Sequence, residues 1–391
     1  MRHFRHLTPD VRHTLFHQEP AEFTTASPAR TLSVALGATL YSPATRSQLA
    51  ADVIKQASRG VVSMVLCLED SIADADVATA EDNLIRQFTE LEQLTGATAV
   101  DELPLLFIRV REPEQITGLV RRLGPAARLL CGFVLPKFTE ERGIAFLEAL
   151  TSAESQYGQR LFAMPVLESP ELLYLESRAE TLAGIVRTVD KYRDRVLALR
   201  LGVTDFCAAY GLRRTPDMTA YDVKLIATVI ADVVNTLGRS DGTGFTITGP
   251  VWEYFRLHER MFKPQLRRSP FTGRGAEELR TDLIEHDMDG LLREIELDRV
   301  NGLQGKTCIH PSHVAPVHAL SVVSHEEFSD ATDIVRPERH GGGVLRSSYT
   351  NKMNEVKPHR AWAERTLLRA EVFGVARENV DFVDLLAAVT R

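Results

Sequence analysis

Short apolar runs recur through the first three quarters of the chain, and most are followed by a stretch in which apolar residues return every three or four positions. The runs predict strands that begin near residues 38, 61, 105, 132, 161, 196, 245 and 307, and the periodic stretches predict helices between them. A nearly continuous apolar run such as Val61–Leu68 is typical of a parallel strand that is covered on both faces. We therefore predict an α/β protein in which residues 37–318 form a (β/α)8 TIM barrel. A doubly wound open sheet is the alternative, but no glycine-rich fingerprint follows the first strand.

The two ends of the chain have a different composition. Residues 1–36 mix basic residues with Thr, Ser, Pro and Ala, which predicts an irregular N-terminal arm. Beyond residue 318 the chain becomes polar and acidic, Gly341–Gly343 interrupts it, and helical spacing returns at Ala361–Phe373 and Phe382–Val389. We expect residues 319–391 to form a C-terminal helical lid or oligomerisation segment outside the barrel.

Charge and hydropathy narrow the class of function. The 391 residues carry a formal net charge of -7 with a pI near 6.0, whereas proteins that bind nucleic acid or anionic membranes usually carry a basic surplus. No apolar run has the length of a membrane span, and the first residues lack the apolar core of a secretory signal. We expect a cytoplasmic protein that acts on a small molecule, with neither nucleic acid nor a membrane as partner.

Charged side chains follow six successive predicted strands. In chain order they are Arg46, Glu69 with Asp70, Arg109 with Arg111, Lys137, Glu168 and Asp205. Each one alone is equally well explained by a strand end that reaches solvent. Because the chemistry of a TIM barrel lies at the C-terminal ends of its strands, we expect these side chains to share one rim and to form an active site.

The two acids at the ends of the fifth and sixth predicted strands suit a divalent cation. Glu168 ends a buried run, where an unpaired carboxylate is costly, and Asp205 ends the next run. Oxygen ligands of this kind favour Mg2+, with Mn2+ as an alternative. The metal would polarise a 2-oxo or 2-hydroxy group and stabilise the enolate that forms when a carbon–carbon bond breaks or forms.

The remaining charges have open roles. Arg109 suits a bidentate clamp on a substrate carboxylate. Glu69 and Asp70 either orient metal-bound water or form ion pairs with Lys137 or Arg109. His310, after the last predicted strand, is either a general base or a hydrogen-bonding residue that closes the barrel, and we favour the second interpretation.

Several motifs together carry a family resemblance. In chain order they are Pro43-Ala44-Thr45-Arg46, Leu68-Glu69-Asp70-Ser71, Ile108-Arg109-Val110, Val134-Leu135-Pro136-Lys137, Pro165-Val166-Leu167-Glu168-Ser169, Gly202-Val203-Thr204-Asp205-Phe206 and Gly305-Lys306-Thr307-Cys308-Ile309-His310-Pro311. Over about residues 38–315 the chain resembles the citrate lyase beta-subunit and malyl-CoA lyase group of the phosphoenolpyruvate/pyruvate-type barrels. It looks most like the divergent carbon–carbon lyase branch associated with tellurium-resistance gene clusters.

The resemblance implies a specific chemistry. It implies Mg2+ on Glu168 and Asp205, a substrate carboxylate on Arg109, and cleavage or formation of a 3-hydroxy acid or its thioester. It also implies a homo-oligomer in which the C-terminal segment packs over a neighbouring subunit's site. The residues expected to act in catalysis are Arg109, Glu69, Asp70 and Lys137, and those expected to bind the substrate are Arg46, Arg109, Arg111, Pro165 and Thr204.

Three departures from the family pattern change the expected substrate. Arg111 stands where the family usually has asparagine, Thr204 replaces a smaller residue, and Phe206 replaces an aliphatic one. These changes put a CoA thioester in doubt and favour a more anionic substrate, including a phosphorylated acid. A metal-dependent thioester hydrolase, a phosphoryl-transfer enzyme and a non-catalytic ligand-binding subunit remain as alternative functions.

Overall fold

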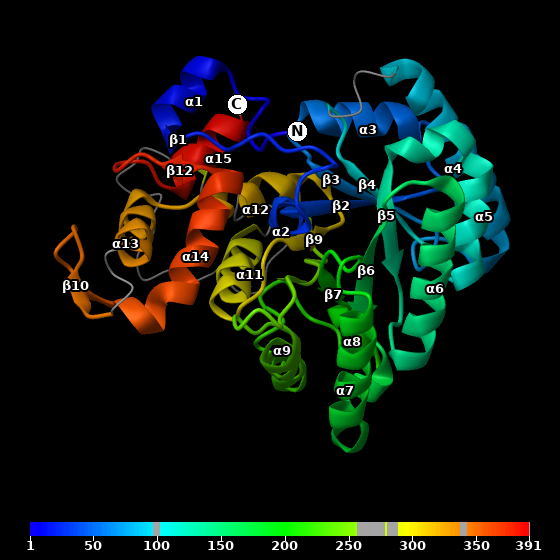
Figure 1. Cartoon of the computed structure of the whole chain (residues 1–391). Coiled ribbons are helices and arrows are strands. Elements are labelled where there is room, and N and C mark those ends of the chain that lie inside the picture. Colours follow the sequence, from blue (N-terminus) through cyan, green and yellow to red (C-terminus); the bar gives the residue numbers. More distant parts are fainter. Residues whose placement is uncertain (97–101, 256–277, 280–287, 337–341, 391) are drawn as a thin grey trace.

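Eight parallel strands form the centre of the protein (Figure 1). The structure is a computed structural model that describes residues 1–96, 102–255, 278–279, 288–336 and 342–390. The strands are β2 (Ala38–Pro43), β3 (Ser63–Cys67), β4 (Leu105–Arg109), β5 (Leu130–Leu135), β6 (Phe162–Leu167), β7 (Leu199–Leu201), β8 (Ile247–Thr248) and β9 (Lys306–Cys308). They are hydrogen-bonded in the order β8-β7-β6-β5-β4-β3-β2-β9.

Hydrogen bonds between the two outer strands complete the barrel. The Gly249 N–H donates to the Gly305 carbonyl at 3.0 Å, and the Thr307 N–H donates to the Gly249 carbonyl at 3.1 Å. The helices that alternate with the strands are α3 (Leu49–Ser58), α4 (Val77–Thr95), α5 (Pro113–Leu123), α6 (Glu140–Tyr157), α7 (Leu175–Lys191), α9 (Lys224–Leu237), α11 (Met288–Val300) and α12 (Val314–Ser321). The predicted TIM barrel and its eight strand positions are confirmed. The helix predicted between the last two strands is found from Met288 onward, and residues 280–287 lie outside the described part.

Local sequence signals begin two helices immediately after strands that carry candidate site residues. Glu112 and Gln115 form a reciprocal capping box at the start of α5, where Pro113 takes the first helical position. Thr139 caps α6 by accepting a hydrogen bond from the Arg142 N–H. These caps fix the chain just beyond the ends of β4 and β5.

The barrel interior is apolar on one side and polar on the other. The strands β3 to β6 contribute Val65, Phe107, Val134 and Met164, which are fully buried. On the opposite side, the buried Arg200 of β7 donates through Nη2 to Thr307 Oγ1 at 2.7 Å.

Residues before β2 and after α12 close the N-terminal end of the barrel. Helix α2 (Ala29–Ala35) packs against α14 (Val356–Phe373), and their Leu32 and Phe373 side chains join the apolar cluster inside the barrel. Strand β1 (Phe16–Gln18) pairs with β12 (Val375–Ala376), which connects the two ends of the chain. The C-terminal segment therefore packs on its own barrel at the end opposite the predicted active site.

The first 36 residues are more regular than the predicted irregular arm. They contain α1 (Pro9–Leu15), β1 and α2. Thr8 caps α1 and Pro9 takes its first position, a signal that is visible in the sequence.

The C-terminal segment also contains α13 (His325–Val335), the hairpin of β10 (Val344–Arg346) and β11 (Met353–Glu355), and α15 (Phe382–Thr390). None of the helices in the described part of the chain combines the length and apolar character needed to cross a membrane.

Candidate active site

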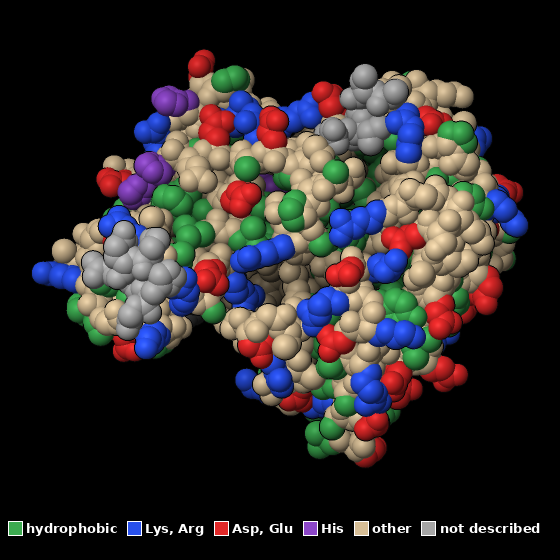
Figure 2. All heavy atoms as spheres, in the orientation of Figure 1, with side chains coloured by type: hydrophobic (Ala, Val, Ile, Leu, Met, Phe, Trp, Pro, Cys, Tyr) green, Lys and Arg blue, Asp and Glu red, His purple; other side chains and the backbone are tan. Residues whose placement is uncertain are grey.

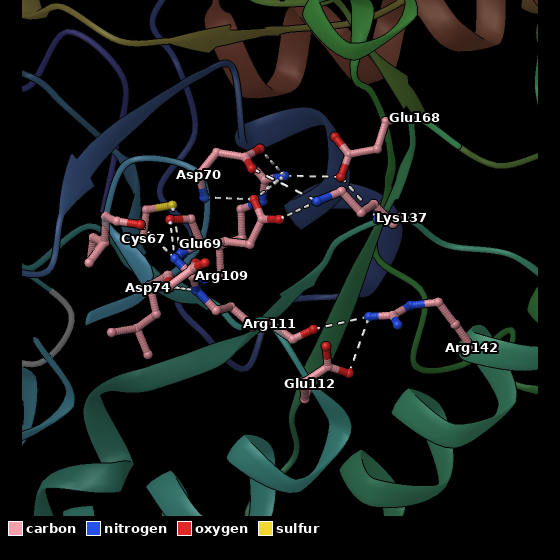
Figure 3. A network of polar contacts seen from close by, with 12 residues as sticks. Cys67, Glu69, Asp70, Asp74, Arg109, Arg111, Glu112, Lys137, Arg142 and Glu168 are labelled. Atoms are coloured by element: carbon pink, nitrogen blue, oxygen red, sulfur yellow. Dashed lines mark hydrogen bonds and ion pairs between the residues drawn. The ribbon is translucent and has the colours of Figure 1, made fainter. Parts of the chain in front are cut away.

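An ion-paired cluster lies where strands β3 to β6 end (Figure 3). Arg109, the last residue of β4, is at its centre. Its Nη2 atom lies 2.8 Å from Glu69 Oε2, 3.1 Å from Asp70 Oδ2 and 3.0 Å from Glu168 Oε1. Glu69 and Asp70 thus form the ion pairs considered for them, and their orientation of metal-bound water stays a prediction.

Lys137, two residues beyond β5, connects two of these acids. Its side-chain Nζ lies 2.9 Å from Glu69 Oε1, and its backbone N–H donates to Glu168 Oε1 at 2.9 Å. Lys137 has a positive φ of 49°, which is rare for a residue with a side chain. The left-handed turn thus directs both the main chain and the side chain of one residue at the acids.

Glu168 is the most deeply buried acid of the cluster, with a side chain that is 2% exposed. Gly202 immediately precedes the short helix α8 (Val203–Ala208). It packs directly against Glu168, since a Cβ at Gly202 would overlap the Glu168 side chain. Asp205 lies in the first turn of α8, and its charge acts on Glu168 and on Asp70. The missing side chain at Gly202 therefore lets the start of α8 approach Glu168.

The acids of the cluster differ in how readily they ionise. Burial, together with repulsion from Asp205, raises the pKa of Glu168 to about 7 although Arg109 opposes the shift. Burial also raises the pKa of Asp205. Burial opposes ionisation of Glu69, yet hydrogen bonds from Asp70 and Lys137 and the charge of Arg109 lower the pKa of Glu69 to about 2. Burial and the contact with Glu69 raise the pKa of Asp70 to about 6.

We call these side chains the rim cluster: Glu69, Asp70, Glu168, Asp205, Arg109 and Lys137. When all four carboxylates are ionised, the two cations leave two negative charges uncompensated, which is the charge that one divalent cation would neutralise. Within the described residues, no group of three or more His, Cys, Asp or Glu side chains has a metal-binding arrangement. Mg2+ is commonly held by only one or two carboxylates, with water and substrate oxygens as its other ligands. Glu168 and Asp205 fit that donor set.

Arg111 makes its contacts beside the rim cluster. Its guanidinium donates to the Leu68 carbonyl at 2.7 Å, to the Ile72 carbonyl at 2.6 Å and to Asp74. These bonds fix the loop that carries Glu69 and Asp70. A direct contact between Arg111 and a substrate stays a prediction.

The other predicted substrate-binding residues take no part in the ion pairs of the rim cluster. Arg46 pairs with Asp52 at 2.6 Å, and its side chain is 55% exposed. Thr204 donates to Glu253 Oε1 at 3.0 Å, and Pro165 is buried within β6. Their contact with a substrate stays a prediction.

Two residues that the sequence interpretation missed lie close to the rim cluster. Burial raises the pKa of Tyr41, on β2, while the charges of Arg200 and Arg109 act in the opposite direction. The Arg200 guanidinium lies 5.4 Å from the centre of the Tyr41 ring. An arginine between Leu199 and Leu201, in the middle of an apolar run, was a visible signal that β7 carries a buried charge into the barrel.

His310, after β9, stacks on Phe255 with ring centres 4.6 Å apart. Its Nδ1 atom lies 2.7 Å from Ser312 Oγ, and the ring is accessible to solvent. Because Nδ1 also accepts the Ser312 N–H, His310 caps the turn that follows β9. The favoured role in closing the barrel stays a prediction.

Comparisons with known proteins agree with this architecture. Residues 30–375 match the model of a family described as a carbon–carbon bond lyase of the TIM-barrel fold. Among solved structures, the chain is similar to CitE from Mycobacterium tuberculosis in complex with magnesium, acetoacetate and coenzyme A. That match has 18% identity and a TM-score of 0.52, and it covers 86% of this chain and 99% of that chain. RipC from Yersinia pestis matches with 17% identity and a TM-score of 0.44 over 73% of this chain and 95% of that chain.

A malate synthase from Haloferax volcanii in a magnesium/glyoxylate complex matches with 13% identity and a TM-score of 0.48, over 72% of this chain and 73% of that chain. At these identities the structural likeness shows the fold alone, and no curated protein sequence matches the chain. The association with tellurium-resistance gene clusters stays a prediction. Because the family model spans most of its length, the chain belongs to the carbon–carbon bond lyase family of the TIM-barrel fold.

Proposed function

We propose that this protein is a Mg2+-dependent carbon–carbon bond lyase or aldolase that cleaves or forms a 3-hydroxy acid, or its thioester, through an enolate. The observation that carries the proposal is the rim cluster, in which Glu168 and Asp205 bring excess negative charge close to Arg109. Glu168 and Asp205 would hold the metal, and Mn2+ would suit the same oxygen ligands. Bound Mg2+ would supply a Lewis acid for the oxygen on which negative charge develops.

The cations of the rim cluster would bind the anionic substrate. Three carboxylates hold Arg109 in place, so its guanidinium is oriented before a substrate carboxylate arrives. The hydrogen bond to Glu69 raises the pKa of Lys137, which keeps its amine protonated at neutral pH. Lys137 therefore serves as a positive charge for the substrate and not as a base.

Glu69 and Asp70 would take different parts in proton transfer. Glu69, with a pKa of about 2, stays ionised and positions Arg109 and Lys137. Asp70, with a pKa of about 6 and a half-exposed side chain, can gain or lose a proton near neutral pH. That property suits a general acid or base at the enolate.

The test combines metal binding with turnover. We expect Glu168→Gln and Asp205→Asn each to weaken Mg2+ binding, measured by calorimetry, and Mg2+-dependent turnover of 3-hydroxy acids by about 100-fold or more. Glu180→Gln is the matched control, because this carboxylate lies on α7, is 81% exposed and pairs only with Arg187 among the described contacts. Full activity of either site variant after metal removal would refute the metal assignment.

Product analysis then tests the reaction class. Products in which a carbon–carbon bond has been cleaved would support the lyase reaction. Hydrolysis of a thioester, or phosphoryl transfer, with the carbon skeleton intact contradicts it. Binding of Mg2+ and oxaloacetate or pyruvate without turnover of any 3-hydroxy acid contradicts it as well, and supports a ligand-binding subunit.

A further inference from the structure

A cavity of about 640 Å³ lies between the C-terminal segment and the barrel. It is lined by α11, by the loop that precedes β9 and by α14, at the end of the barrel opposite the rim cluster. Its volume lies within the range of about 300–1,000 Å³ that is usual for small-molecule sites. Figure 2 shows that this face of the protein is hollowed near α11 and that Lys and Arg side chains gather around the hollow.

Helix α14 contributes one of its sides to the cavity. Trp362, Arg365, Thr366 and Arg369 all line it, and their spacing of three and four residues places them on one face of the helix. Trp362 is 37% exposed, so part of its indole is free to pack against a ligand. The sequence thus places one aromatic ring and two guanidinium groups side by side along the cavity wall.

The guanidinium groups of the cavity share few carboxylates. Glu327 accepts from both Arg299 and Arg369, at 3.3 and 2.9 Å. Arg365 donates to the Gly302 carbonyl at 3.4 Å, and no carboxylate within the described chain lies in ion-pair range of it. The buried Nε of Arg369 has no hydrogen-bond partner among the described residues, and burial lowers the pKa of Arg369 in spite of Glu327.

The other acids near the cavity already have cations of their own. Asp298 lies 2.6 Å from the buried Lys306. Glu296 pairs with Arg299 at 2.9 Å. Arg299, Arg365 and Arg369 are therefore balanced only by Glu296 and Glu327. One positive charge of the cavity has no carboxylate to neutralise it among these residues.

We propose that this cavity binds a small organic anion whose carboxylate or phosphate contacts Arg365 and Arg369 and whose apolar body packs on Trp362. Guanidinium groups match the planar oxygens of such anions, and a half-exposed indole offers an apolar surface at low entropic cost. The ligand would not touch the rim cluster, which lies at the other end of the barrel. The inference is independent of the proposed lyase reaction.

The test uses simple probes on the full chain. The chain contains two tryptophans, of which Trp362 lines the cavity and the fully buried Trp252 does not, so quenching by a probe bound in the cavity acts mainly on Trp362. We expect phenyl phosphate or benzoate to quench this fluorescence and to bind at least tenfold more tightly than inorganic phosphate or neutral benzyl alcohol. Comparison of the affinities for phenyl phosphate and benzoate then shows whether the cavity prefers a phosphate or a carboxylate.

Three variants locate the probe. We expect Arg365→Gln and Arg369→Gln to weaken its binding at least tenfold, and Arg360→Gln to leave it unchanged. Arg360 lies on the same helix and pairs with Glu364, but it does not line the cavity. Arg365 is exposed, so its variant should keep the fold, which circular dichroism would check.

Three outcomes would overturn the proposal. They are the absence of binding by both organic anions, equal binding in the Arg360 and Arg365 variants, and a change in subunit number in Arg365→Gln without probe binding to the parent chain. The last result would mean that a second copy of the chain occupies the cavity.

Discussion

The backbone N–H of Lys137 donates to the buried Oε1 of Glu168 at 2.9 Å while Lys137 itself has a left-handed conformation with a φ of 49°. Such a conformation costs about 1 kcal/mol for a residue with a Cβ. Strain of this kind persists where the surroundings enforce it, and it gathers at functional sites. The strained residue here is the one that orients the most buried acid of the rim cluster.

This strain predicts an unusual order of stability for two substitutions. Lys137→Ala and Lys137→Gly both remove the amine, but only glycine relieves the strained φ. We expect the glycine variant to have a free energy of unfolding about 1 kcal/mol higher than the alanine variant, measured by urea denaturation. At Lys55, exposed in α3, the same pair should show the opposite order, because alanine favours a helix by about 1 kcal/mol over glycine. The same order at both positions would show that Lys137 is not strained.

A second prediction separates the two possible roles of Arg111. If this residue mainly holds the loop of Leu68 and Ile72, Arg111→Met should lower the free energy of unfolding by about 2–3 kcal/mol, because several charged hydrogen bonds are lost. Arg46→Met is the control, since the exposed pair with Asp52 is worth only about 0.5 kcal/mol. Unchanged stability with a raised KM would instead support a direct contact between Arg111 and the substrate.

The sequence predicts the positions of residues better than their contacts. The apolar runs locate all eight strands, and the rule that site residues follow barrel strands brings Glu69, Arg109 and Glu168 to one rim before any coordinates are known. Position after a strand does not decide where a long side chain reaches. Arg109 and Arg111 are only two residues apart, yet Arg109 contacts the acids of the rim cluster, and Arg111 contacts backbone carbonyls and Asp74.

The sequence pattern also did not predict where the C-terminal segment packs. Helical spacing predicted α14, but the spacing does not say which surface its apolar face covers. Phe373 packs with Leu32 at the N-terminal end of the barrel, and this contact joins residues far apart in the chain. The predicted packing over a neighbouring subunit's site stays a prediction.

A third prediction concerns the buried charges behind β9. Lys306 is fully buried and pairs with Glu294 at 2.8 Å and with Asp298 at 2.6 Å. Lys306→Met would leave two buried carboxylates short of a cation, so we expect the free energy of unfolding to fall by about 3–5 kcal/mol. Arg293→Met, which removes an exposed pair with Asp222, should cost less than about 1 kcal/mol. An equal loss of the free energy of unfolding in the two variants would show that the buried ion pairs of Lys306 stabilise the fold no more than an exposed pair does.

The last prediction concerns the buried His3, whose ring packs on Phe373 with centres 4.2 Å apart. Burial lowers the pKa of His3 from 6.5 to about 3, although a hydrogen bond to the Ala35 carbonyl opposes the shift. Below pH 6.5 His3 takes up a proton in the unfolded chain but stays neutral in the folded chain. The stability that His3 contributes is therefore complete above pH 6.5 and falls by about 1.4 kcal/mol for each pH unit as the pH drops toward 3.

His3→Phe keeps an aromatic ring at this position and removes the titrating group. We expect its free energy of unfolding, measured by urea denaturation between pH 7 and 5, to decline with acidification less steeply than that of the parent chain, by about 1 kcal/mol per pH unit. His13→Phe is the control for the substitution itself, because His13 is exposed on α1. If His3→Phe and the parent chain lose stability in parallel, His3 carries a proton in the folded protein, and the N-terminal segment must then open to solvent at mildly acidic pH.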